Sequence, residues 1–290
     1  MCYDKMKNEK GVAALPGNIL FNLLYALICG FTEFLGVDAT THCRMFELLS
    51  GKQQTDLIMP VALRAGLIVA LLVSNWSRLR RLMRERSYSR RSRRLKRPPD
   101  PIAQLDLKFL RMAILPIIAG VFLYTKTAGF TYGFLAMTLV LLLNAAILLV
   151  PRMINSGNKD GRSVSRLDGI LLGLGGVAGF VPGLSRMGCM LTGGAVAGLD
   201  RGYCLDMALI LSIPALLGMI VLDVMALLAA KVALSLTMVA LGLLYACLAF
   251  VGGWLSVVTM RFLSIKIGFT GFAYYSFGLA LFTFVFYLVI

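Results

Sequence analysis

The sequence predicts an all-α protein that crosses a membrane several times. Of its 290 residues, 59% are hydrophobic and only 15% are charged, and the mean hydropathy is +0.82. A soluble domain usually has about 25% charged residues. The apolar residues also fall in long blocks, as long as the roughly 17–25 residues that a membrane-spanning helix needs. We therefore expect a single integral membrane domain over residues 1–290.

Six apolar blocks are long enough to be membrane spans. They lie at about 57–74, 109–125, 132–150, 203–227, 232–260 and 270–290. The first block contains Arg64, which is costly in lipid and should therefore face the protein interior. Asp206 and Asp223 lie near the two ends of the fourth block, so we expect both at a membrane interface.

Two further apolar stretches, at about 15–50 and 169–200, are interrupted by polar residues. Broken backbone is tolerated at membrane depth only where it is buried in protein or lines a wet cavity. We interpret each stretch as a re-entrant helical hairpin. Because three spans follow each hairpin, the sequence predicts an inverted repeat with units 1–150 and 151–290. Paired broken segments of this kind indicate a binding site near the midplane.

The net charge of +15 is concentrated in one segment, since Arg78 to Arg97 holds 11 of the 29 Lys and Arg residues. No aromatic platform or base-reading module accompanies it, which argues against nucleic-acid binding. We expect an Arg-rich cytoplasmic loop at about 75–108. With both hairpins re-entrant, 20 of the 29 cations fall on that side and 6 on the other, which places both termini outside the cell. We expect no cleavable signal peptide, because the N-terminus lacks a small-residue cleavage site after a short apolar core.

The six cysteines form no CxxC pair and mostly lie in or beside apolar segments. We expect them to be small buried hydrophobic residues rather than a disulfide or zinc framework.

The break in the second hairpin reads "PGLSRMG", residues 182–188. A half-helix that begins inside the membrane directs free N–H groups and a positive dipole end at the cavity, which suits phosphate. Gly183 and Gly188 would allow close backbone approach, Ser185 offers a hydroxyl, and Arg186 offers a planar fork of donors. The alternative is a simple helix break whose arginine extends to the surface.

The break in the first hairpin contains "FTEFLGVDATTH", residues 31–42. Glu33 could hold a divalent cation or act as a base, and Thr40 and Thr41 add hydroxyls. His42, the only histidine, could be an acid, a base or a phosphate donor, or a hydrogen-bonded structural residue. Asp38 could take part in the chemistry or cap the following half-helix.

These motifs resemble those of the undecaprenyl-diphosphate phosphatase family, membrane enzymes linked to bacitracin resistance. The family's first motif, Glu-Gly-x-Thr-Glu-Phe-Leu-Pro-[Ile/Val]-Ser-Ser-Thr-Gly-His, stands here as "CGFTEFLGVDATTH", residues 29–42. Its second, Pro-Gly-[Thr/Val]-Ser-Arg-Ser-Gly, is "PGLSRMG". Further similar segments at 114–122, 208–221 and 271–281 extend the resemblance over nearly the whole chain.

The resemblance implies a polyprenyl-diphosphate phosphatase, a hydrolase acting on a phosphoric anhydride. It would convert undecaprenyl diphosphate to undecaprenyl phosphate at the outer face of the bacterial cell membrane, in the lipid-carrier recycling of peptidoglycan synthesis. Glu33, His42 and Arg186 would then be catalytic, and a divalent cation, Mg²⁺ or Ca²⁺, would bind at Glu33. We expect polyprenyl diphosphate and the membrane as partners, no nucleic acid, and allow for a homodimer.

Several positions depart from the family pattern. Cys29 replaces the first glutamate, Ala39 replaces a serine, and Gly36, Thr41 and Met187 also differ. A neutral thiol does not replace a carboxylate for Mg²⁺ or Ca²⁺. Asp38 could partly rebuild a two-carboxylate metal site with Glu33. The departures leave a second hypothesis open, a catalytically impaired relative that binds or translocates polyprenyl phosphate.

Overall fold

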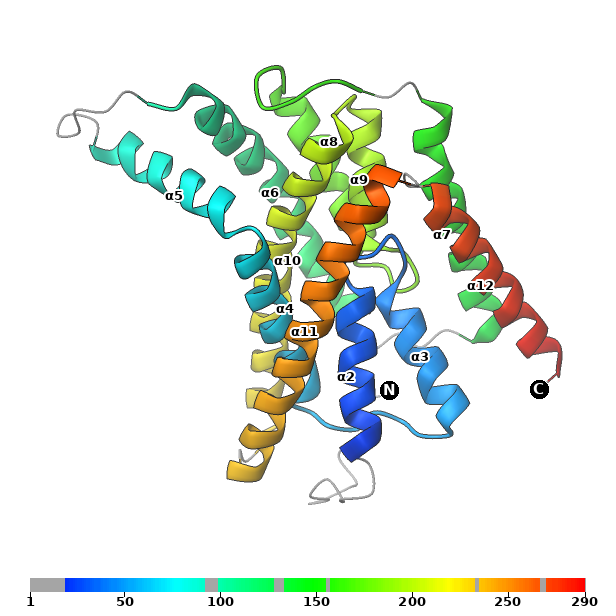
Figure 1. The fold of residues 1–290 in the computed structure, drawn as a ribbon. Helices are drawn as coiled ribbons and strands as arrows, with labels where there is room; N and C mark the ends of the chain where they lie inside the picture. The colour runs from blue at the N-terminus through cyan, green and yellow to red at the C-terminus, as the bar shows by residue number, and fades with distance from the viewer. Residues whose placement is uncertain are drawn as a thin grey trace.

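The computed structural model describes residues 19–91, 99–127, 133–154, 157–232, 235–266 and 270–289. Over these ranges the chain is helical and has no named strand, as the sequence predicts (Figure 1). The helices are α2 Ile19–Thr32, α3 Ala39–Ser50, α4 Met59–Ser74, α5 Trp76–Arg91, α6 Pro101–Thr127, α7 Phe134–Met153, α8 Arg166–Ala178, α9 Arg186–Val196, α10 Arg201–Ala229, α11 Leu236–Lys266 and α12 Thr270–Val289.

Five helices are long and apolar enough to cross a membrane, namely α6, α7, α10, α11 and α12, and the bent pair α4–α5 provides a sixth candidate. Large apolar side chains such as Phe122, Leu139 and Leu243 are exposed on their outer surfaces. Lipid tails accommodate such surfaces, and the helices satisfy their own backbone hydrogen bonds. The protein is therefore a multi-pass membrane protein. The N-terminal region in which no signal peptide is expected lies outside the described residues.

The two predicted hairpins are present as α2–α3 and α8–α9. Their helices are interrupted at residues 33–38 and 179–185, where the sequence places the polar motifs. Helix α2 packs against α11, and α8 packs against α6, so each hairpin lies on a long helix of the other half. In Figure 1 the hairpins occupy opposite ends of the bundle and their breaks lie near its centre. The inverted repeat itself stays a prediction.

The apolar block predicted at 57–74 forms α4, which ends at a sharp bend. It has 16 residues and meets α5 at an angle of 81°. At the junction the side-chain amide of Asn75 donates to the carbonyl of Leu71 at 2.9 Å, a local bond that competes with helix continuation. Arg261 of α11 donates to the Ser74 carbonyl at 3.2 Å and to Asn75 Oδ1 at 2.8 Å. These contacts fix the end of α4.

The Arg-rich segment expected as a loop at 75–108 is largely helical. Arg, Leu, Met and Glu favour helix, and they dominate α5. Helix α5 leaves the bundle at the end opposite the start of α2 (Figure 1) and packs against α6. Leu82 and Glu85 are buried on α5. Part of the predicted loop, residues 92–98, lies outside the described residues.

Asp100 fixes the start of α6. Its Oδ1 accepts hydrogen bonds from the backbone N–H groups of Ile102 and Ala103, both at 3.2 Å. Arg81 of α5 binds the same carboxylate through two nitrogens, at 2.7 and 2.9 Å. The hydrogen bond from Arg81 is the main reason that the pKa of Asp100 falls to about 2.

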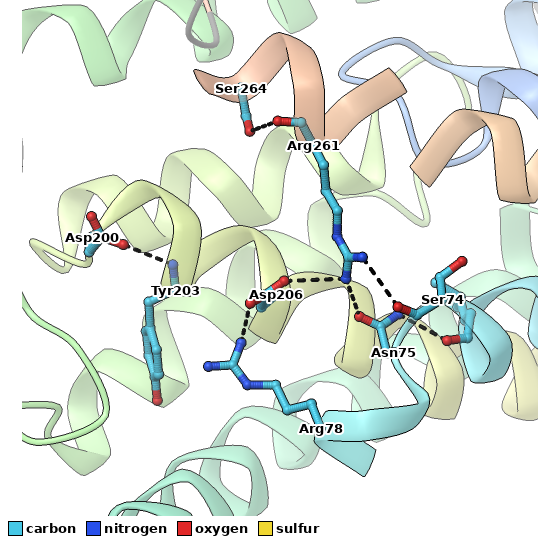
Figure 2. Close-up of polar contacts among 9 residues, drawn as sticks. Ser74, Asn75, Arg78, Asp200, Tyr203, Asp206, Arg261 and Ser264 are labelled. Carbon is cyan, nitrogen blue, oxygen red and sulfur yellow. Dashed lines mark hydrogen bonds and ion pairs between the residues drawn. The ribbon is translucent and has the colours of Figure 1, made fainter. Parts of the chain in front are cut away.

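Asp206 connects three helices at the end of the bundle where α4 meets α5. Figure 2 shows Arg78 of α5 and Arg261 of α11 converging on this carboxylate of α10. Because Arg261 also binds Ser74 and Asn75, one network holds the α4–α5 junction against α10 and α11.

Asp206→Ala should therefore loosen this junction. The groups are partly exposed, so we expect a loss of about 1 kcal/mol, which lowers Tm by roughly 2–4 °C. Thermal unfolding in detergent measures the effect, with the exposed Asp160→Ala as the control variant. An unchanged Tm for Asp206→Ala would show that the network does not hold the bend.

Candidate functional site

A cavity of about 320 Å³ lies where the two hairpin breaks meet, and we call it the central cavity. Its lining comes from α2, α3, α4, α6, α9, α10, the α3–α4 connection and the two breaks. Its volume is at the lower end of the usual range for ligand pockets, about 300–1,000 Å³. Among the described residues, the carboxylates and guanidiniums in its lining are Glu33, Asp38, Arg64 and Arg186.

Arg186 and Glu33 form an ion pair in this cavity, with Arg186 Nη1 3.2 Å from Glu33 Oε1. The Arg186 side chain is only 11% exposed, so the alternative of an arginine that extends to the surface is wrong. Its guanidinium lies 5.4 Å from the centroid of the Phe180 ring, and Nη2 lies 3.7 Å from the sulfur of Met219. Its buried Nε makes no hydrogen bond, and Nη1 is held only by the ion pair with Glu33. Buried donors without partners are costly, which indicates a ligand that completes them.

Ser185 joins the two breaks and does not line the cavity. Its hydroxyl donates to the Leu35 carbonyl at 3.1 Å and accepts from Gly188 N–H at 3.0 Å, which caps α9. Its own N–H donates to Asn144 Oδ1 of α7 at 2.9 Å. The hydroxyl predicted to bind phosphate is thus turned toward the other hairpin, and the side chain is 1% exposed.

Asp38 fulfils the capping hypothesis and also lines the cavity. Its Oδ2 accepts hydrogen bonds from Thr41 N–H at 2.6 Å and from the Thr41 hydroxyl at 2.8 Å. Thr41 is therefore buried in this cap, whereas Thr40 lies in the cavity lining. The first turn of α3 and the first residue of α9 thus both border the cavity, and the N-terminus of a helix favours anions.

His42 does not line the central cavity. Its Nδ1 lies 2.6 Å from the carbonyl oxygen of Asp38, and its Nε2 lies 2.7 Å from the hydroxyl of Tyr275 on α12. Because a carbonyl only accepts, Nδ1 carries a proton, and in the neutral ring Nε2 accepts from Tyr275. A direct catalytic role for His42, which stays a prediction, would need the ring to leave these partners.

Gly183 and Gly188 are used for packing rather than for close approach to a ligand. Gly183 has φ +92°, and a Cβ there would lie 2.6 Å from the Val140 side chain. A Cβ at Gly188 would lie 2.7 Å from Leu148. Both contacts are with α7, and neither glycine lines the cavity. Their smallness lets the second break lie against α7.

Arg64 lines the same cavity, a role that the sequence analysis did not assign. Its position in an apolar block indicated only that Arg64 faces the protein interior. Asp223 forms an ion pair with Arg64, and its placement at a membrane interface stays a prediction. The two residues are 159 positions apart, so their pairing has no local sequence pattern.

The donor set of the cavity fits a divalent cation that arrives with a phosphate ligand. Among the described residues, no cluster of three or more His, Cys, Asp or Glu could hold a metal. Glu33 and Asp38 nevertheless place two carboxylates in one lining. Mg²⁺ usually binds one or two carboxylates together with substrate phosphates and waters, so two carboxylates suffice for such a site.

Cys29 and Cys43 form a disulfide between α2 and α3, with their Cα atoms 5.9 Å apart. The expectation of no disulfide was therefore wrong for this pair. The hairpin turn brings together two helices whose facing residues are 14 positions apart, which a search for CxxC spacing does not detect. Both cysteines line the cavity. Cys189, Cys204 and Cys247 are free, and Cys2 lies outside the described residues.

Reduction of this bond, or Cys43→Ser, should destabilise the first hairpin. Closing a loop of this length typically stabilises a protein by about 2–4 kcal/mol. Thermal unfolding with and without reductant measures the effect, with Cys247→Ser as the matched control because Cys247 is free. Alkylation of the unfolded, unreduced protein should spare Cys29 and Cys43, and labelling of both would contradict the disulfide.

Three curated relatives cover most of the chain at low identity, and each is named undecaprenyl-diphosphatase. The protein from Methanobrevibacter smithii is 27% identical over 223 residues, 71% of this chain and 76% of its own. The enzyme named undecaprenyl-diphosphatase 1 of Shouchella clausii is 26% identical over 275 residues, 93% and 96% of the two chains. That of Neisseria meningitidis is 24% identical over 272 residues, 91% and 94%.

The family model described as "Bacitracin resistance protein BacA" matches residues 22–282, which include the breaks of both hairpins and all of the cavity lining. This match agrees with the resemblance found in the two motifs. It gives no support to the hypothesis of a catalytically impaired relative. The chain belongs to the BacA family of bacitracin resistance proteins.

Proposed function

We propose that this protein hydrolyses undecaprenyl diphosphate to undecaprenyl phosphate and inorganic phosphate. In this role it would recycle the lipid carrier of cell-wall synthesis and confer resistance to bacitracin. The relatives named undecaprenyl-diphosphatase support this assignment, and so does membership of the BacA family.

One observation carries the proposal on structural grounds. Arg186 lies at the start of α9 in a cavity that α3 also borders, and its buried Nε has no hydrogen-bond partner while Nη1 is paired only with Glu33. A guanidinium with free donors at a helix N-terminus is suited to phosphate oxygens.

The reaction breaks the phosphoric anhydride bond. Water attacks the terminal phosphorus, its oxygen stays on the released phosphate, and the bridging oxygen leaves with the lipid monophosphate. Arg186 would hold the terminal phosphoryl group and stabilise the negative charge of the transition state. Glu33 would orient Arg186 and accept the proton of the attacking water as the guanidinium turns to phosphate.

Arg186→Ala and Glu33→Gln should each lower kcat/KM at least about 100-fold, because each removes a charged group aimed at the reacting phosphate. Phosphate release from undecaprenyl diphosphate by the purified protein in detergent measures this loss. Arg166→Ala, an exposed arginine at the start of α8, is the matched control. Undiminished turnover by Arg186→Ala would refute the assignment, and a wild-type protein without turnover would favour a binding relative.

A divalent cation, Mg²⁺ or Ca²⁺, would neutralise part of the diphosphate charge when bound, and Glu33 and Asp38 would hold it. Glu33, Asp38 and Asp223 together offset the two guanidiniums, so a diphosphate adds negative charge to a site that has no excess of positive charge.

Removal of divalent cations with EDTA should therefore abolish turnover, and added Mg²⁺ or Ca²⁺ should restore it. Asp38→Asn keeps a good helix cap while removing the charge, so it should raise the cation concentration needed for half-maximal activity about tenfold. A titration of activity against free cation measures both effects. Full activity in EDTA would contradict the role of the cation.

The site is proposed to face the outside of the cell, with the Arg-rich segment in the cytoplasm. The distribution of cations along the chain supports this orientation. The disulfide beside the cavity supports it as well, because disulfides persist in oxidising compartments. A homodimer stays a prediction.

A further inference from the structure

Arg64 belongs to a three-residue cluster contributed by three helices. It forms an ion pair with Asp223 of α10, and its Nη2 donates to the hydroxyl of Tyr124 on α6. That hydroxyl donates in turn to Asp223 Oδ1 at 3.2 Å. The guanidinium also lies 5.1 Å from the centroid of the Tyr124 ring. Asp223 and Tyr124 therefore fix the orientation of Arg64 from two directions.

The cluster presents only part of itself to the central cavity. Arg64 and Tyr124 line the cavity, whereas Asp223 does not. Asp223 therefore binds Arg64 from outside the cavity lining, whereas Arg64 itself borders the cavity. An arginine in an apolar helix is costly, and a buried ion pair is weak evidence for stability. Binding of an anion by the Arg64 guanidinium therefore explains the presence of this arginine better than the attachment of α4 to α10 alone.

Arg64 and Arg186 border the same cavity. Both line the one cavity, and Glu33 is attracted electrostatically to each of them while being paired directly with Arg186. The two guanidiniums come from different halves of the chain, α4 and α9. A ligand with two linked phosphoryl groups offers one phosphoryl group to each guanidinium.

We propose that Arg64 is a second anion-binding residue of the central cavity, positioned by Asp223 and Tyr124 to receive the second phosphoryl group of a diphosphate. This inference rests on the proposed function and deepens it. Arg186 would hold the terminal phosphoryl group and Arg64 the one attached to the lipid. Cleavage of the anhydride bond separates the two groups, so the products lose the bridged binding mode and are released more readily.

The experiment compares the affinities of the full-length protein in detergent for undecaprenyl diphosphate and for undecaprenyl phosphate. We expect the wild-type protein to prefer the diphosphate. Arg64→Gln should weaken diphosphate binding about tenfold or more, the effect of one charge-assisted hydrogen bond, and monophosphate binding much less. Arg186→Ala should weaken binding of both ligands.

Two further variants separate recognition from anchoring. Arg78→Gln is the matched control, because it breaks another arginine–aspartate pair with α10 that does not reach the cavity. The double variant Arg64→Gln/Asp223→Asn removes both charges, so no unpaired carboxylate remains to unfold the protein. It should show the same loss of diphosphate preference as Arg64→Gln, while Arg78→Gln should keep the wild-type ratio.

An unchanged affinity ratio in the folded double variant would overturn the inference, as would a wild-type protein without preference for the diphosphate. The readout does not need hydrolysis. A wild-type protein that binds the diphosphate through Arg64 without hydrolysing it would refute the proposed function and support this inference. An active enzyme whose ratio is insensitive to Arg64 would refute only the inference.

Discussion

The structure depends on the contact between two interrupted helices inside an apolar bundle. Each break exposes backbone groups and polar side chains that lipid cannot satisfy. The breaks solve this problem for each other, since Ser185 donates to the carbonyl of Leu35 and Arg186 pairs with Glu33. Each hairpin also packs on a long helix from the other half of the chain. The cavity is therefore a product of the fold, because neither break can be buried alone.

Patterns local in sequence predicted the helices and the two breaks well. Apolar blocks of sufficient length gave five spans, and Gly, Pro and charged residues inside two other blocks marked the hairpins. The cap formed by Asp38 also follows from residues within one turn. The predicted end of the first block at residue 74 matches the end of α4, but the contact that holds it was not foreseen, because Arg261 approaches Ser74 from 187 positions away. The apolar sequence around Arg64 predicts that its side chain avoids lipid. Only the packing of α4 against α10 identifies Asp223 as its partner.

The site was predicted less completely than the fold because motif membership does not determine where a side chain points. Glu33 and Arg186 meet in the cavity, but Ser185 and His42 turn to other partners. The Ser185 hydroxyl caps α9 by accepting a hydrogen bond from the backbone N–H of Gly188. This capping role explains the serine in the motif without a contact to phosphate. The disulfide of Cys29 shows the same limitation. Its partner lies across the hairpin, in a pattern that only the turn geometry reveals.

The charges of the cavity are arranged so that each guanidinium already has a carboxylate. Arg186 faces Glu33, and Arg64 is held by Asp223. In the absence of ligand these pairs limit the cost of burying cations in an apolar bundle. An entering anion has to compete with Glu33 for Arg186, and a weakly charged ligand gains little from doing so. A diphosphate carries enough charge on two linked groups to engage both arginines at once. Selectivity for such a ligand would therefore follow from the pairing itself, without a contact that recognises the lipid chain.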